Sequence, residues 1–107
     1  MKNITVTIDG QVVNGVNVSF VSQDKDQSSE SFEQLSWIRT DKMIESANDK
    51  ENQDDPFFDY TEISLKSTDD DWLTLEYKDD NGQMIYREMI PKKNIVNVEI
   101  FYNDSRR

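Results

Sequence analysis

Carboxylates are the only abundant side chains in this sequence that could do chemistry. Its 107 residues include 22 Asp and Glu against 12 Lys and Arg, with no His and no Cys. Without these two residues the chain lacks an ordinary base near neutral pH, a thiolate nucleophile, disulfides and soft metal ligands. A glycosidase with paired acids would still need two carboxylates about 5 to 9.5 Å apart in a sugar-binding cleft, for which the chain offers little room. We therefore expect a protein that is not an enzyme.

The first candidate binding segment is residues 54–60, which sets three aromatic residues among three acids. Desolvated aromatic side chains are common anchors of an interface, and acids beside them would orient a basic partner. In the alternative interpretation Pro56 begins a strand and the aromatic side chains enter the core. Two adjacent Phe residues on a strand face opposite sides, so exposure of either Phe57 or Phe58 would favour a partner.

Two further acidic segments flank a predicted strand. Residues 69–71 precede it as three consecutive carboxylates, which favour an exposed turn, and Trp72 falls on the polar face of the strand. Residues 79–83 follow it and resemble part of a calcium-binding loop. Tyr77, however, stands where such a loop has its first Asp, and the flanks alternate as strands do. We expect a hairpin turn there, with no metal and no other cofactor.

The negative charge is concentrated in one part of the chain. Residues 24–80 carry 18 acids and 6 bases, whereas the remainder carries 4 acids and 6 bases. A contiguous acidic surface can stand in for nucleic-acid phosphates on a basic protein groove, and it disfavours binding of free DNA or RNA. The alternative is that this charge only keeps a small protein soluble. The residues expected to contact a partner are Asp54, Asp55, Phe57, Asp69, Asp70, Asp71, Trp72, Asp79 and Asp80.

These features predict an acidic module that binds a basic protein surface, most plausibly on a nucleic-acid-binding protein, without contacting nucleic acid directly. In size and charge the chain resembles small acidic inhibitors from phages and mobile elements, such as anti-restriction and anti-CRISPR proteins, although no motif assigns it to a family. The alternative function is a structural or assembly β domain that self-associates or pairs through an edge strand. We expect a monomer or weak dimer.

The expected location is the cytoplasm, without membrane contact. The first eight residues alternate polar and apolar side chains, whereas a secretory signal needs a continuous apolar run. No window approaches the 18 or more apolar residues of a membrane span. The absence of Cys is typical of a cytosolic protein.

The elements that must position these residues are mostly strands. Ile, Val and Thr number 23 against 5 for Ala and Leu, which favours β structure. We expect an α+β, mainly β fold, a small antiparallel barrel or curved sheet of about six strands with one helix packed on it. Residues 1–102 are expected to form a single domain and residues 103–107 a frayed tail.

The helix is expected over residues 31–47, where Ser31 and Gln34 resemble a capping box and apolar residues recur at helical spacing. The polar stretch 39–42 leaves open a strand followed by a short helix. Polar loops are expected at residues 22–31 and 48–55.

Two predictions concern how the terminal strands are placed. Asp9 and Gly10 are typical of a hairpin turn after the first strand, which returns through residues 11–21. On the return, Asn14 and Gly15 indicate either a bulge with a left-handed glycine or the turn itself. The last strand, 95–102, has apolar residues on both faces and is expected to be central.

Overall fold

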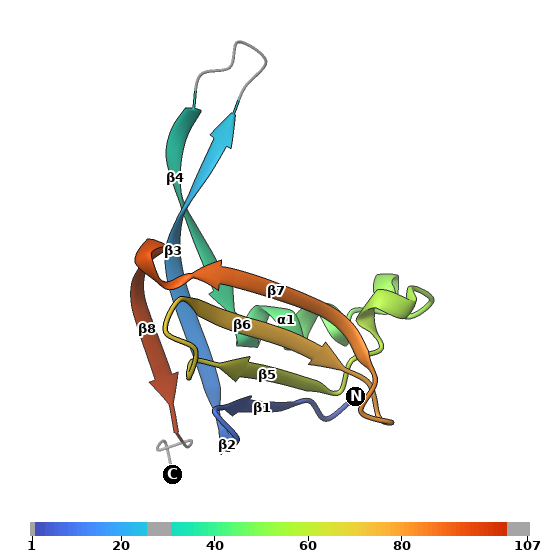
Figure 1. Cartoon of the computed structure of the whole chain (residues 1–107). Coiled ribbons are helices and arrows are strands. Elements are labelled where there is room, and N and C mark those ends of the chain that lie inside the picture. The colour runs from blue at the N-terminus through green and yellow to red at the C-terminus, as the bar shows by residue number, and fades with distance from the viewer. Residues whose placement is uncertain (1, 26–30, 103–107) are drawn as a thin grey trace.

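The computed structural model describes residues 2–25 and 31–102, which fold into two curved sheets and one α-helix (Figure 1). One sheet has the strand order β2-β1-β5-β6-β7 and the other the order β4-β3-β8, and neither closes into a barrel. The mainly β fold with a single helix is therefore confirmed, with eight strands where about six were expected. The elements are β1 (Thr5–Ile8), β2 (Gln11–Val13), β3 (Gly15–Lys25), β4 (Ser31–Arg39), α1 (Thr40–Ala47), η1 (Lys50–Asn52), η2 (Pro56–Phe58), β5 (Glu62–Lys66), β6 (Trp72–Lys78), β7 (Met84–Pro91), η3 (Lys92–Asn94) and β8 (Ile95–Phe101).

The five-stranded sheet is mixed rather than antiparallel. β1 turns into β2 through Asp9 and Gly10, whose φ angles of 49° and 84° fit the hairpin expected there. The other neighbour of β1 is β5, and this pair is parallel. β5, β6 and β7 then form an antiparallel meander whose last turn contains Gly82 at a φ of 77°.

The return from the first hairpin is not one strand, because the chain changes sheets between β2 and β3. Asn14 separates the two strands, and Gly15 does not have a positive φ. Both interpretations of this pair, the left-handed bulge and the hairpin turn, are therefore wrong. A Cβ atom on Gly15 would lie 3.2 Å from Thr40 Oγ1, so the close approach of Thr40 limits side-chain size there.

Residues 31–39, predicted to be helical, form strand β4, and the helix is confined to α1. The alternative of a strand followed by a short helix is confirmed. Ile38 is buried whereas Trp37 and Leu35 are exposed, so these apolar side chains alternate between two faces rather than forming one helical stripe. The helix begins at buried Thr40, whose Oγ1 accepts a hydrogen bond of 2.9 Å from the Val16 N–H.

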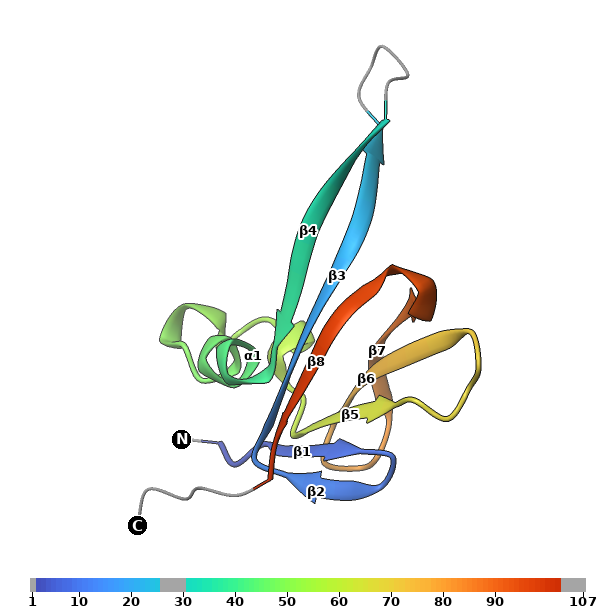
Figure 2. The same cartoon turned by 90° about the vertical axis from the view of Figure 1, so that its left-hand side faces the viewer.

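Strands β3 and β4 extend into a region that was expected to be a loop. β8 pairs with β3 only over the first half of that strand, so residues 21–25 and 31–35 continue as a two-stranded arm beyond the body (Figures 1 and 2). The radius of gyration, 15.2 Å, exceeds the roughly 13 Å of a compact chain of this length. The loop prediction is wrong for residues 22–25 and 31, while residues 26–30 and the tail 103–107 lie outside the described part of the chain.

β8 is an edge strand rather than a central one. It lies at one end of the order β4-β3-β8, and Val96, Val98 and Phe101 are exposed. The prediction that this strand is central is therefore wrong, and its apolar residues on both faces are partly exposed to solvent.

The core lies between the two sheets. The core side chains that are at most 4% exposed include Val16, Val18, Ile38, Ile63, Leu65, Leu73 and Leu75. Burying each such side chain contributes roughly 1.5–3 kcal/mol. α1 is joined to this core by buried Ala47 and by Met43, whose carbonyl oxygen accepts a 2.7 Å hydrogen bond from the Tyr60 hydroxyl.

Candidate partner-binding site

Phe57 stands at the centre of an aromatic cluster. Its ring packs edge-on against Phe58, Tyr60, Tyr77 and Tyr86, with centroid distances of 5.1 to 6.3 Å. Because Pro56 begins the short helix η2 and the Asp55 carboxylate accepts a 3.0 Å hydrogen bond from the Phe57 N–H, the local backbone is fixed. Phe57 remains 39% exposed, so the aromatic side chains of this segment are neither all buried nor on a strand.

The same cluster forms one wall of an open cleft of about 350 Å³. The Tyr60 and Tyr77 hydroxyls bond to the Met43 carbonyl and sulfur, and burial raises the pKa of both phenols. These two tyrosines therefore stay neutral, and their hydrogen bonds to Met43 fix their positions in the lining of the cleft. The residues lining the cleft are Trp37, Arg39, Lys42, Met43, Ser46, Phe57, Phe58, Tyr60 and Tyr77.

Acids from two distant segments meet beside this cluster. Asp59, two residues after Phe57, shares a surface hollow with Asp79 and Asp80 of the β6–β7 turn and with Lys2. Tyr77 and Tyr86, which flank that turn, both contact Phe57. We refer to this region, Asp54, Asp55, Phe57, Asp59, Asp79 and Asp80, as the acidic end.

The remaining predicted residues lie elsewhere. Residues 69–71 and Trp72 stand at the opposite end of β6 from the 79–83 turn (Figure 1). Seven strand residues separate the two groups, a span of roughly 20 Å. Trp72 is 38% exposed and lies on the opposite face from Leu73, as its phase predicted. The structure thus divides the predicted contact residues into two groups.

The second group is accompanied by bases. Asp70, Asp71 and Trp72 line a hollow of about 460 Å³ together with Lys92 and Lys93. These lysines offset much of the local negative charge. The acidic end has five carboxylates, and the bases near it are Lys2 in the hollow with Asp59 and Arg39 and Lys42 in the cleft with Phe57.

Three of the predicted acids have a structural role. Asp55, Asp69 and Asp79 each accept backbone N–H hydrogen bonds that close their own turns. No hydrogen bond joins the side chain of Asp54 or Asp80 to another described residue. The carboxylates of these two residues are therefore available to a partner.

The outer face of the five-stranded sheet carries an unexpected buried acid. Glu76 is 1% exposed, and its carboxylate is bound by Arg87 at 2.9 Å, by Lys66 at 3.1 Å and by Lys78 at 3.6 Å. Burial raises the pKa of Glu76, but the hydrogen bonds and charges of Lys66 and Arg87 outweigh it and hold the pKa below its usual value. This acid of the central segment is neutralised within the fold and is not part of an acidic surface.

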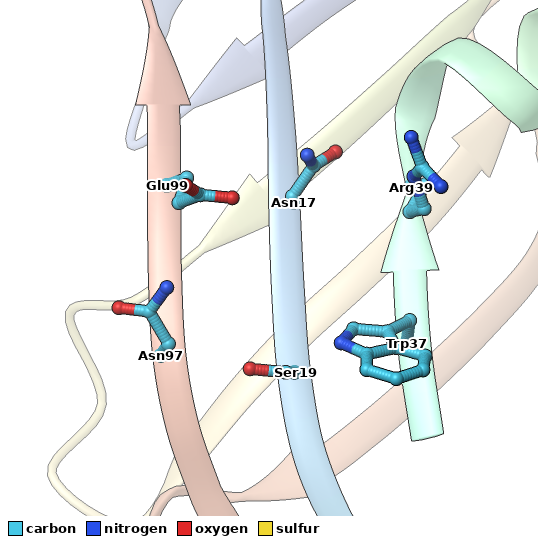
Figure 3. Close-up of a pocket in the computed structure, with 6 residues that line it drawn as sticks. All are labelled: Asn17, Ser19, Trp37, Arg39, Asn97 and Glu99. Carbon is cyan, nitrogen blue, oxygen red and sulfur yellow. The ribbon is translucent and has the colours of Figure 1, made fainter. Parts of the chain in front are cut away.

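A second exposed aromatic site was missed by the sequence analysis. Trp37 is 61% exposed on the outer face of the three-stranded sheet. Figure 3 shows polar side chains beside it on three neighbouring strands. Together they form a hollow of about 370 Å³ lined by Asn17, Ser19, Trp37, Arg39, Asn97 and Glu99. The signal that could have found Trp37 is the two-residue period of a strand, which puts Leu35, Trp37 and Arg39 on one face and Ser36 and Ile38 on the other. The sequence analysis instead predicts a helix over these residues.

Two kinds of site are absent from the described part of the chain. Its acids nowhere gather three or more together in a group that could hold a metal ion. Of the helices within residues 2–25 and 31–102, none has the length and apolar character needed to cross a membrane.

Comparisons with protein-family models, with curated proteins and with solved structures found no match for this chain. The site therefore rests on its own geometry.

Proposed function

We propose that the chain is a non-enzymatic binding module whose acidic end docks on the basic groove of a nucleic-acid-binding protein and thereby inhibits it. The observation that carries this proposal is the position of Phe57. Its exposed ring follows Asp55 and precedes Asp59 by two residues each, and it contacts Tyr77 and Tyr86, which flank the turn that carries Asp79 and Asp80. A half-exposed ring held by four others can enter a partner pocket without first losing much conformational freedom.

The carboxylates of the acidic end orient the chain on its basic partner and speed the association of the two proteins. Carboxylates on one end of a molecule with a formal charge of −10 attract a basic surface over roughly 10 Å at physiological salt, and they replace the phosphates such a groove ordinarily holds. The group at residues 69–72 fits this role less well, because Lys92 and Lys93 lie beside it. The acidic end is thus the favoured docking surface.

A panel of purified basic nucleic-acid-binding proteins tests the proposal, each with its groove empty or filled by a nucleic-acid duplex. We expect binding to at least one empty groove, loss of binding when the duplex is present, and an affinity that falls steeply with salt. Absence of binding at low salt across the panel, or binding that the duplex does not affect, would contradict the proposal.

Two double variants of equal charge locate the surface. D54N/D80N removes two negative charges from the acidic end, and D70N/D71N removes two from the turn before β6. None of these side chains closes a turn. We expect D54N/D80N to slow association by roughly tenfold and D70N/D71N to change it little. Equal effects would show that net charge, rather than the acidic end, determines binding.

Phe57→Leu tests the anchor. It keeps an apolar side chain in the cluster but shortens the exposed ring, so dissociation should become faster by about tenfold. Trp72→Leu, at a side chain of similar exposure, serves as the control, and thermal melting confirms that both variants fold.

A further inference from the structure

The free edge of β8 exposes apolar side chains that no contact within the described part of the chain covers. β8 pairs with β3 on one side, and among the described strands none pairs with it on the other. Val96 is 63% exposed and Val98 40% exposed along this edge. A seven-residue edge strand with exposed apolar side chains is a template for pairing with another strand.

The backbone of β8 has groups ready for such pairing. Val16, opposite Ile100, donates its N–H to Thr40 Oγ1 on the far side of β3. The polar backbone groups of Ile100 therefore face the free edge rather than β3. Val98, two residues earlier, faces the same way, because alternate residues of a strand direct these groups to the same side.

The sequence of β8 is complementary to itself when two copies run antiparallel. A two-fold axis at Val98 places Val98 opposite Val98 of the second copy and Val96 opposite Ile100. It also places each Asn97 opposite Glu99 of the other copy, an amide beside a carboxylate. Moving the axis to Glu99 would instead oppose two like charges, which is destabilising.

The charge around β8 also permits a second copy to approach. β8 and the short helix η3 before it, residues 92–101, contain Lys92 and Lys93 against Glu99, a net charge of +1 in a chain of −10. An acidic chain therefore meets less repulsion here than elsewhere on its own surface.

We propose that two copies of this chain form a two-fold dimer by antiparallel pairing of β8 with β8, centred on Val98. The pairing joins two three-stranded sheets into one six-stranded sheet with the order β4-β3-β8-β8-β3-β4. It leaves the acidic end of each copy, which is formed by the η2 segment and the β6–β7 turn, outside the new interface. The proposal is independent of the function proposed above.

Light scattering after size exclusion, at protein concentrations up to about 1 mM, tests the dimer with a matched pair of variants. Val98→Lys opposes two ammonium groups at the two-fold axis and should weaken the dimer by more than about tenfold. Val12→Lys introduces the same charge at another exposed valine, on edge strand β2, and the dimer should persist. A monomer at every concentration in the unmodified chain would overturn the proposal, as would equal effects of the two variants.

Substitutions at Asn97 test the register without touching the core. Asn97→Lys places a base opposite Glu99 twice per dimer, and Asn97→Glu places an acid there. We expect the dimer to become about fivefold tighter with Lys and about fivefold weaker with Glu. Equal responses to both charges would overturn the register, and a dimer unaffected by all β8 variants would place the interface elsewhere. Melting temperatures of each variant show that it folds.

Discussion

The two sheets of this protein differ in how completely their side chains are covered. In the five-stranded sheet, Leu65, Leu73 and Leu75 are buried, and even a carboxylate on the outer face, Glu76, is shielded from water. In the three-stranded sheet, Leu35, Trp37, Val98 and Phe101 are exposed although all four are apolar. Both sheets therefore contribute buried side chains to the core, and the three-stranded sheet also offers apolar surface for contacts with other molecules.

The largest expected difference comes from removing the same leucine atoms in each sheet. Leu75→Ala leaves a cavity in the core and should lower the free energy of unfolding by about 2–5 kcal/mol. Leu35→Ala, in the arm, should cost less than about 1 kcal/mol because that side chain is exposed. Urea unfolding measures both. Similar losses would show that the two sheets contribute equally to stability.

A smaller contrast separates a buried from an exposed glutamate. Glu76→Gln removes the charge that three bases surround and should cost about 1–3 kcal/mol at neutral pH. Because the pKa of Glu76 is lowered in the folded chain, its ionised form stabilises the fold above the unfolded pKa of about 4.3. That contribution is lost as the pH falls through the folded pKa, so the difference between variant and parent should vanish in acid.

Glu99→Gln is the matched change on the three-stranded sheet. Glu99 is exposed, so this variant should differ from the parent by less than about 0.5 kcal/mol at every pH. Unfolding by urea across a pH series measures both variants. A pH-independent cost of Glu76→Gln would show that its carboxylate acts through shape rather than charge.

The smallest contrast concerns two serine hydroxyls. Ser64 bonds to Thr7 at 3.2 Å in a buried position, so Ser64→Ala leaves a buried hydroxyl without its partner and should cost about 1 kcal/mol. Ser22 bonds to Ser36 at 3.1 Å in the arm, and Ser22→Ala should leave global stability unchanged. Hydrogen exchange should instead become faster at amides near Ser36. A global effect of Ser22→Ala would mean that the arm unfolds together with the core.

The errors of sequence reasoning follow the same division between the sheets. Alternation in residues 62–66 and 72–78 predicted β5 and β6 correctly. Such a pattern assumes that the apolar face of a strand enters the core, and Ile63, Leu65, Leu73, Leu75 and Tyr77 do so. In β4 and β8 that assumption fails. Trp37 and Leu35 are apolar yet exposed, so the apolar pattern of β4 wrongly predicted part of a helix. The two apolar faces of β8 wrongly predicted a central strand.

The candidate site was predictable in its parts but not in its assembly. Each acidic segment was visible from its composition, and Asn81 with Gly82 gave the turn that presents Asp79 and Asp80. Their meeting with Phe57 depends on aromatic packing between η2 and two strands, which local sequence does not encode. Residues 69–72 are separated from Asp79 and Asp80 by the length of β6. The sequence predicts both ends of this strand, but the division of the acids into two groups follows only once its length is considered.

The turn-closing role of Asp55, Asp69 and Asp79 bears on how this chain can change over evolution. An Asn side chain offers the same oxygen acceptor without the charge, so Asp→Asn leaves these turns closed, whereas Lys or Ala opens them. A descendant under pressure to become less acidic can therefore lose three negative charges, from −10 to −7, through amides at these three positions with its fold intact. Its net charge would change while the three turns kept their hydrogen bonds, so the acidity of the chain can change over evolution without a change of fold.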